Sequence, residues 1–76
     1  MFDLFIMESC PYCRKVMNYL HENGIPFHKF DITNSDNEKM LLALGGKDQV
    51  PFLHDEENDV KMYESDDIIK YASNLQ

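Results

Sequence analysis

Basic residues are scarce in this sequence, and they are not clustered. Seven Lys and Arg residues stand against fourteen Asp and Glu residues, which gives a net charge of -7. The basic residues are scattered along the chain as Arg14, Lys15, Lys29, Lys39, Lys47, Lys61 and Lys70. A nucleic acid requires a patch of positive charge to neutralise its phosphates, so we expect no nucleic-acid partner.

Long hydrophobic runs are also absent. No apolar stretch approaches the roughly 20 residues that a membrane helix needs. The N-terminal segment MFDLFIM contains Asp3, lacks a cationic start and is too short for a signal peptide, so it predicts a first strand. We therefore expect a cytoplasmic protein that does not bind membranes. A length of 76 residues predicts a single domain over 1–76 with a small core.

Cysteine occurs only twice, in the tetrapeptide Cys10-Pro11-Tyr12-Cys13. This tetrapeptide lies where the apolar strand Phe2 to Met7 passes into a helix that we expect to begin at Pro11. Unpaired NH groups and the helix dipole stabilise a thiolate at such a position. In an intracellular protein this spacing indicates redox catalysis or metal binding rather than a structural disulfide.

Helical periodicity distinguishes the two thiols. Cys13, Val16, Met17 and Leu20 follow i, i+3, i+4, i+7 spacing, which places Cys13 on the buried face of the helix. Cys10 is then the exposed thiol. The pair predicts reversible dithiol/disulfide chemistry.

The sequence predicts no metal site. A closed zinc site needs four ligands, and the two cysteines have no nearby pair of histidines to complete one. The three histidines His21, His28 and His54 are scattered, and we expect structural roles for them.

The remaining pattern predicts the order strand, helix, strand, helix, strand, strand, helix. After the first helix ends at Asn23-Gly24, the expected elements are a strand Phe27 to Asp31, a helix capped by Ser35 with Glu38 and ending at Gly45-Gly46, strands Val50 to His54 and Val60 to Tyr63, and a helix capped by Ser65. A βαβ unit has parallel strands, and the last two strands add an antiparallel hairpin. The order therefore predicts a thioredoxin-like α/β fold, βαβαββα, with a four-stranded mixed sheet covered by three helices.

Three motifs together resemble the glutaredoxin family, over essentially the whole chain. They are the CPYC tetrapeptide, Val50-Pro51 before the third strand, and Ser65-Asp66-Asp67 at the start of the last helix. The resemblance implies that Pro51 is a cis-proline facing the active site. It also implies that the Val50 backbone pairs with the cysteinyl part of glutathione and that Ser65 and Asp66 hold its γ-glutamyl end.

Other positions depart from the family pattern. Met7 and Glu8 stand where many glutaredoxins carry a lysine, and Tyr63-Glu64 replaces the usual Gly-Gly. The Glu64-Ser65 pair and the run Pro51 to Leu53 instead resemble the glutathione-binding half of glutathione transferases. For Lys47 we expect contact with the glycyl carboxylate of glutathione. Tyr12 either stacks on the ligand or is merely exposed, and Glu64 either meets the ligand amine or is a solvated charge.

The resemblance implies a glutathione-dependent thiol-disulfide oxidoreductase that reduces protein-glutathione mixed disulfides and protein disulfides. Cys10 would be the attacking thiolate, Cys13 the resolving thiol, and the two would form the redox-active disulfide. Glutathione is the expected co-substrate, and the expected state is a monomer. Two alternatives remain: a thioredoxin-like electron donor recharged by a flavoprotein reductase, and an iron-sulfur cluster carrier. Pro11 argues against the carrier, because cluster assembly in the family goes with a small residue there.

Overall fold

The computed structural model describes residues 1–75, which form four strands and three helices. The elements are β1 (Phe2–Ile6), α1 (Pro11–Glu22), β2 (Phe27–Asp31), α2 (Ser35–Gly45), β3 (Phe52–Asp55), β4 (Val60–Tyr63) and α3 (Ser65–Asn74). No helix within these residues is long and apolar enough to cross a membrane.

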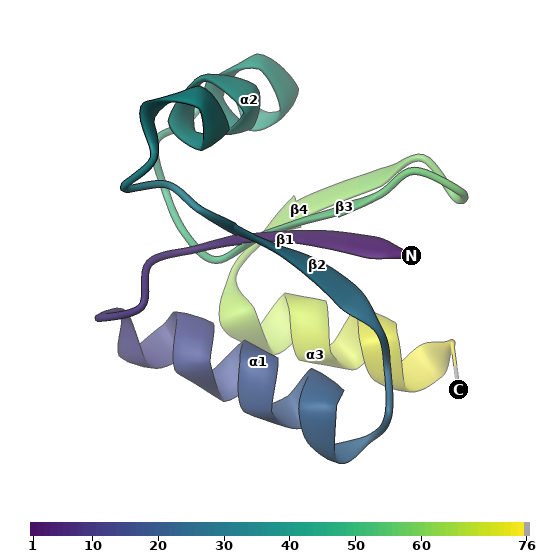
Figure 1. Cartoon of the computed structure of the whole chain (residues 1–76). Coiled ribbons are helices and arrows are strands. Elements are labelled where there is room, and N and C mark those ends of the chain that lie inside the picture. Colours follow the sequence, from purple (N-terminus) through teal and green to yellow (C-terminus); the bar gives the residue numbers. More distant parts are fainter. Residues whose placement is uncertain (76) are drawn as a thin grey trace.

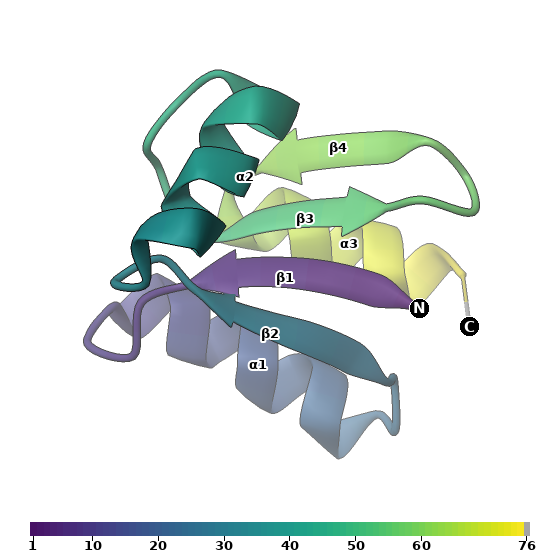
Figure 2. The same cartoon turned by 45° about the horizontal axis from the view of Figure 1, so that its top comes forward.

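The strands form one mixed sheet with the order β2-β1-β3-β4. β1 pairs with β2 in parallel, whereas the β1-β3 and β3-β4 pairs are antiparallel. Helices α1 and α3 lie side by side under one face, and α2 lies alone over the other (Figure 1). The strand order is visible in Figure 2, where β1 lies between β2 and β3. The predicted thioredoxin-like fold is confirmed.

Alternation along β1 divides the core into two parts. Phe2, Leu4 and Ile6 face the layer that holds α1 and α3, and Phe5 faces α2. On the first side they pack with Cys13, Val16, Leu20, Leu53, Ile68 and Ala72, and on the second side Phe5 packs with Ile32, Leu41 and Phe52. Successive side chains of a strand point to opposite faces, so the nearly continuous apolar sequence of β1 serves both layers. This central strand carries the chain directly into the CPYC tetrapeptide.

Two predicted helix caps are wrong. Asn34, not Ser35, caps α2, because its side chain accepts hydrogen bonds from the backbone NH groups of Asp36 and Asn37. Ser65 is the first residue of α3 rather than its cap. The cap position belongs to Glu64, which makes no side-chain capping bond. β1 ends one residue earlier than predicted, and β3 begins at Phe52 rather than Val50, because Pro51 lacks the NH that a sheet ladder uses.

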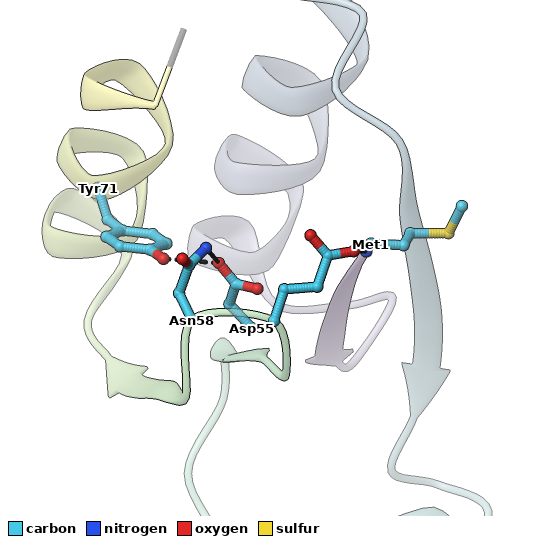
Figure 3. A network of polar contacts seen from close by, with 5 residues as sticks. Met1, Asp55, Asn58 and Tyr71 are labelled. Atoms are coloured by element: carbon cyan, nitrogen blue, oxygen red, sulfur yellow. Dashed lines mark hydrogen bonds and ion pairs between the residues drawn. The ribbon is translucent and has the colours of Figure 1, made fainter.

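A polar network joins the β3-β4 hairpin to α3 (Figure 3). Asp55 is only 2% exposed, and its carboxylate accepts hydrogen bonds from the Tyr71 hydroxyl at 2.6 Å and the Asn58 amide at 2.8 Å. Burial alone would raise the pKa of Asp55, but these hydrogen bonds outweigh it and lower the pKa. Burial, with help from Asp55, raises the pKa of Tyr71 to about 12. The N-terminal amine of Met1 adds an exposed ion pair with Glu57 at 3.1 Å.

Candidate functional site

The two cysteines lie at the N-terminus of α1, directly after β1. Cys10 is the N-cap residue, and Pro11 is in the first turn, where its missing NH costs nothing. The Cys10 Sγ accepts a hydrogen bond from the backbone NH of Cys13 at 3.3 Å. Cys10 is partly exposed, while Cys13 is completely buried. Both are free thiols, and only one of them can be reached from solvent.

The pKa of the buried thiol is strongly perturbed. The pKa of Cys13 is raised to about 12, mainly by burial and in smaller part by the neighbouring Cys10. At neutral pH Cys13 is therefore a protonated thiol. Only the thiolate is a nucleophile, so Cys13 in this state is not suited to the initial attack on a disulfide.

A cleft of about 570 Å³ opens beside this helix terminus. Three segments line it: Tyr12 from α1, Gln49 to Pro51 from the loop before β3, and Glu64 to Asp67 at the start of α3. The Val50-Pro51 peptide bond is cis. Tyr12 of the CPYC tetrapeptide lines this cleft together with Val50 and Pro51, whereas the two cysteines themselves are not among its lining residues. The fold thus brings together motifs that are widely separated in the sequence.

The polar side chains of the cleft are largely acidic. Its lining contains the carboxylates of Glu64, Asp66 and Asp67, and among the described residues that line it there is no lysine, arginine or histidine. One of these carboxylates has a cationic partner outside the lining: the Lys15 ammonium of α1 forms an ion pair with Asp66 at 2.6 Å. Both side chains are more than half exposed, so this pair is weak and easily exchanged for another cation.

Glu64 has a backbone conformation that is rare outside glycine. Its φ is 72°, in the left-handed region. Its carboxylate accepts a hydrogen bond from the Gln49 amide at 3.2 Å, across the rim of the cleft. Such a conformation stores strain of order 1–3 kcal/mol. A glycine would adopt this conformation without strain, which explains why the Gly-Gly of the glutaredoxin pattern suits the position that Glu64 occupies here.

The predicted site residues divide into two groups. Tyr12, Val50, Pro51, Glu64, Ser65 and Asp66 all line the cleft. Tyr12 is 63% exposed, and Ser65 is buried at the base of α3. Lys47 does not line the cleft. Its ammonium lies 5.3 Å from the centre of the Tyr63 ring, and its backbone exchanges hydrogen bonds with the Tyr63 hydroxyl.

Three residues at or beside the cleft were not predicted as site residues. Gln49 lines it and holds Glu64, Asp67 lines it from the first turn of α3, and Lys15 pairs with Asp66. Gln49 and Asp67 are sequence neighbours of predicted motifs, so adjacency could have indicated them. The Lys15 contact joins two helices and carries no local signal in the sequence.

Comparison with known proteins identifies several relatives of the chain. The family model described as the N-terminal domain of glutathione S-transferase matches residues 4–76. The chain is 31% identical over 51 residues to Glutaredoxin 1 of Rickettsia felis, a match that covers 63% of the chain and 50% of that protein. It is 35% identical over 37 residues to the N-acetyl-S-hydroxy-L-cysteine reductase of Bacillus subtilis, covering 49% of the chain and 40% of that protein.

A solved structure extends the similarity to the whole chain. Glutaredoxin 2 of Salmonella typhimurium, in complex with glutathione, superposes with a TM-score of 0.82 at 28% identity and covers 99% of this chain. The match covers only 34% of that protein. The chain thus spans half or less of the length of each of these three relatives.

Proposed function

The chain belongs to the glutathione S-transferase N-terminal domain family, and on this premise we propose that it is a glutathione-dependent thiol-disulfide oxidoreductase of the glutaredoxin type. One observation carries the proposal. A partly exposed thiol at a helix N-terminus, Cys10, stands three positions before a buried thiol, Cys13, and Tyr12 between them lines a cleft together with the loop that contains the cis-proline Pro51. We propose that it acts as a monomer in the cytoplasm, where thiols are kept reduced.

With a glutathionylated protein as substrate, the Cys10 thiolate attacks the sulfur of the glutathionyl group. A bond forms between Cys10 Sγ and glutathione, and the substrate leaves as a thiolate that takes up a proton. A second glutathione thiolate then attacks the glutathionyl sulfur on Cys10, which releases oxidised glutathione and regenerates the Cys10 thiolate. This cycle requires Cys10 alone.

With a disulfide inside a protein as substrate, Cys10 attacks one sulfur and forms a mixed disulfide with the substrate. Cys13 then loses its proton and attacks Cys10 Sγ, so the Cys10-Cys13 disulfide forms and the substrate leaves as a dithiol. Two glutathione molecules reduce this disulfide and become oxidised glutathione. Because the pKa of Cys13 is about 12, its deprotonation must accompany its attack.

The cleft contains groups suited to glutathione. The free NH groups at the start of α3, near Ser65 and Asp66, suit the γ-glutamyl carboxylate, and the carboxylates of Asp66 and Glu64 suit its ammonium. The ammonium would replace Lys15 at Asp66. The backbone of Val50, before Pro51, suits the cysteinyl part, and Tyr12 can cover the ligand. Lys47 would have to leave the Tyr63 ring to reach the glycyl carboxylate.

Two cysteine variants test the assigned roles. Cys10→Ser should abolish the reduction of a glutathionylated peptide in an assay coupled to glutathione reductase. Cys13→Ser should retain that reaction and lose the reduction of a protein disulfide. Retained activity in Cys10→Ser together with loss in Cys13→Ser would reverse the assignment.

A thioredoxin-like electron donor is a second candidate, and one observation favours it. The described residues that line the cleft include no cation that could bind the glycyl carboxylate of glutathione. Met7 and Glu8, just before the cysteines, do not supply one either, and the nearby Lys29 is paired with Glu8. Turnover supported by thioredoxin reductase and NADPH, without glutathione, would select this candidate. We expect turnover with glutathione and glutathione reductase instead.

A further inference from the structure

A second recess lies at the opposite end of β1 from the cysteines, on the other face of the sheet. It has a volume of about 260 Å³ and is lined by Asp3, Met40, Ala43, Leu44, His54 and Glu56. The helix α2 supplies the apolar wall, and β1 and β3 supply the polar groups. The redox chemistry proposed above uses none of these residues.

The strand register places two of the polar side chains next to each other. Asp3 and His54 are direct partners in the antiparallel β1-β3 pair. They share the sheet face of Phe5 and Phe52, which packs against Leu41 of α2. Their side chains are only 19% and 12% exposed, and the His54 Nδ1 lies 3.9 Å from the Asp3 Oδ2.

A third group joins them from the turn that follows β3. A ligand atom of Glu56 lies within 4.8 Å of the corresponding atoms of Asp3 and His54. Apart from the 3.9 Å contact, which is too long for a hydrogen bond, none of the three side chains has a polar side-chain partner among residues 1–75. Three hydrogen-bonding side chains therefore converge in one recess without satisfying one another.

One imidazole nitrogen and two carboxylate oxygens form a set of ligands that suits a divalent transition metal. Nitrogen and oxygen ligands bind Zn²⁺ at roughly 2.0–2.2 Å, so they stand about 3–3.5 Å apart around the ion. The three ligand atoms lie within 4.8 Å of one another, and His54 Nδ1 and Asp3 Oδ2 lie 3.9 Å apart, so small side-chain adjustments of all three residues would be needed to reach that spacing. We propose that Asp3, His54 and Glu56 bind one Zn²⁺ ion and leave its remaining coordination positions to water.

The charges around the recess favour a cation such as Zn²⁺ over an anion. The two carboxylates give the recess a negative charge, and the whole chain is acidic. Lys61 is the register partner of His54 on β4 and the nearest cation by register, but no ion pair among the described residues joins it to Asp3 or Glu56. The metal would link β1 to the start of the β3-β4 turn, so binding should stabilise the fold by mass action.

The test must first remove the thiols, because a CxxC pair can bind zinc by itself. We would titrate Zn²⁺ by calorimetry into the Cys10→Ser/Cys13→Ser protein and follow its melting temperature. We expect one equivalent to bind and the melting temperature to rise. Co²⁺ should give a d-d absorption spectrum without the thiolate charge-transfer bands of a cysteine site.

Single variants then locate the ion. His54→Gln and Asp3→Asn should each weaken binding by tenfold or more. His21→Gln is the matched control, because His21 lies exposed in the last turn of α1 and should leave binding unchanged. Circular dichroism would show that each variant is folded. Absence of binding to the cysteine-free protein, or equal binding by the His54→Gln and His21→Gln variants, would overturn the proposal.

Discussion

At the scale of single residues, the protein is organised around two chemically unequal thiols. Cys10 caps a helix and is partly exposed, whereas Cys13 is buried, with a pKa of about 12. The inequality follows from position, because Cys10 caps the end of the helix whereas Cys13 begins the buried stripe that Val16 and Leu20 continue. It supports the proposed roles, in which Cys10 attacks and Cys13 resolves the mixed disulfide.

This inequality predicts selective alkylation. With iodoacetamide at neutral pH, we expect Cys10 to react and Cys13 to remain unmodified in the folded protein, because Cys13 is neither accessible nor ionised. Peptide mass spectrometry after short labelling would measure both. Unfolding in urea should make both thiols reactive and serves as the control. Equal labelling of the two cysteines in the folded protein would contradict the assignment.

The residues of the candidate site were predictable to the extent that their signal is local. The cysteine spacing and the Val50-Pro51 and Ser65-Asp66 motifs each consist of residues that are close together in the sequence. The Val50-Pro51 and Ser65-Asp66 motifs line one cleft. The contact of Lys15 with Asp66 and the convergence of Asp3 with His54 depend on chain segments that meet only after folding. No local pattern marks either of them.

At the scale of elements, the strand and helix order was predictable because hydrophobic periodicity and turn residues agree along the chain. The errors lie at element ends. Asn34 and Ser35 are both good capping residues, so only the path of the chain after β2 decides between them. Glu64 occupies a cap position in a left-handed conformation, which its residue type does not indicate.

The link between the β3-β4 hairpin and α3 gives a prediction of stability. Tyr71→Phe removes a hydrogen bond to the buried Asp55 carboxylate, so it should lower the free energy of unfolding by roughly 1–3 kcal/mol. Urea denaturation at pH 7 measures this change. Tyr12→Phe is the control, because the Tyr12 side chain is largely exposed and should change stability little.

The same network predicts how stability depends on pH. The pKa of Asp55 is lower in the folded protein than its ordinary value of about 3.9, so its contribution is present above that value and is lost as the pH falls. Asp31, whose pKa is lowered by hydrogen bonds from Thr33, contributes in the same direction. The wild type should therefore lose more stability than Tyr71→Phe on acidification below about pH 4. Parallel acid profiles of the two proteins would contradict the role of Tyr71.

At the scale of the whole molecule, the charge of -7 and the acidic cleft favour substrates with positive charge near their disulfide. We expect cystamine, a cationic disulfide, to be reduced several-fold faster than an anionic disulfide such as that of 3-mercaptopropionate. The ratio should fall as salt is added, because salt screens exposed charges. The Asp67→Asn substitution in the cleft should lower this ratio of rates, whereas the control Asp59→Asn in the β3-β4 turn should leave the ratio unchanged. Equal rates at low salt would contradict this preference.

The central claim is that electrons reach the Cys10-Cys13 pair from glutathione. Its most direct test is the rate at which the protein reduces a glutathionylated peptide, measured against glutathione concentration with glutathione reductase present. The rate should rise with glutathione concentration and saturate, and it should vanish in Cys10→Ser. A rate indifferent to glutathione and sustained by thioredoxin reductase would contradict it.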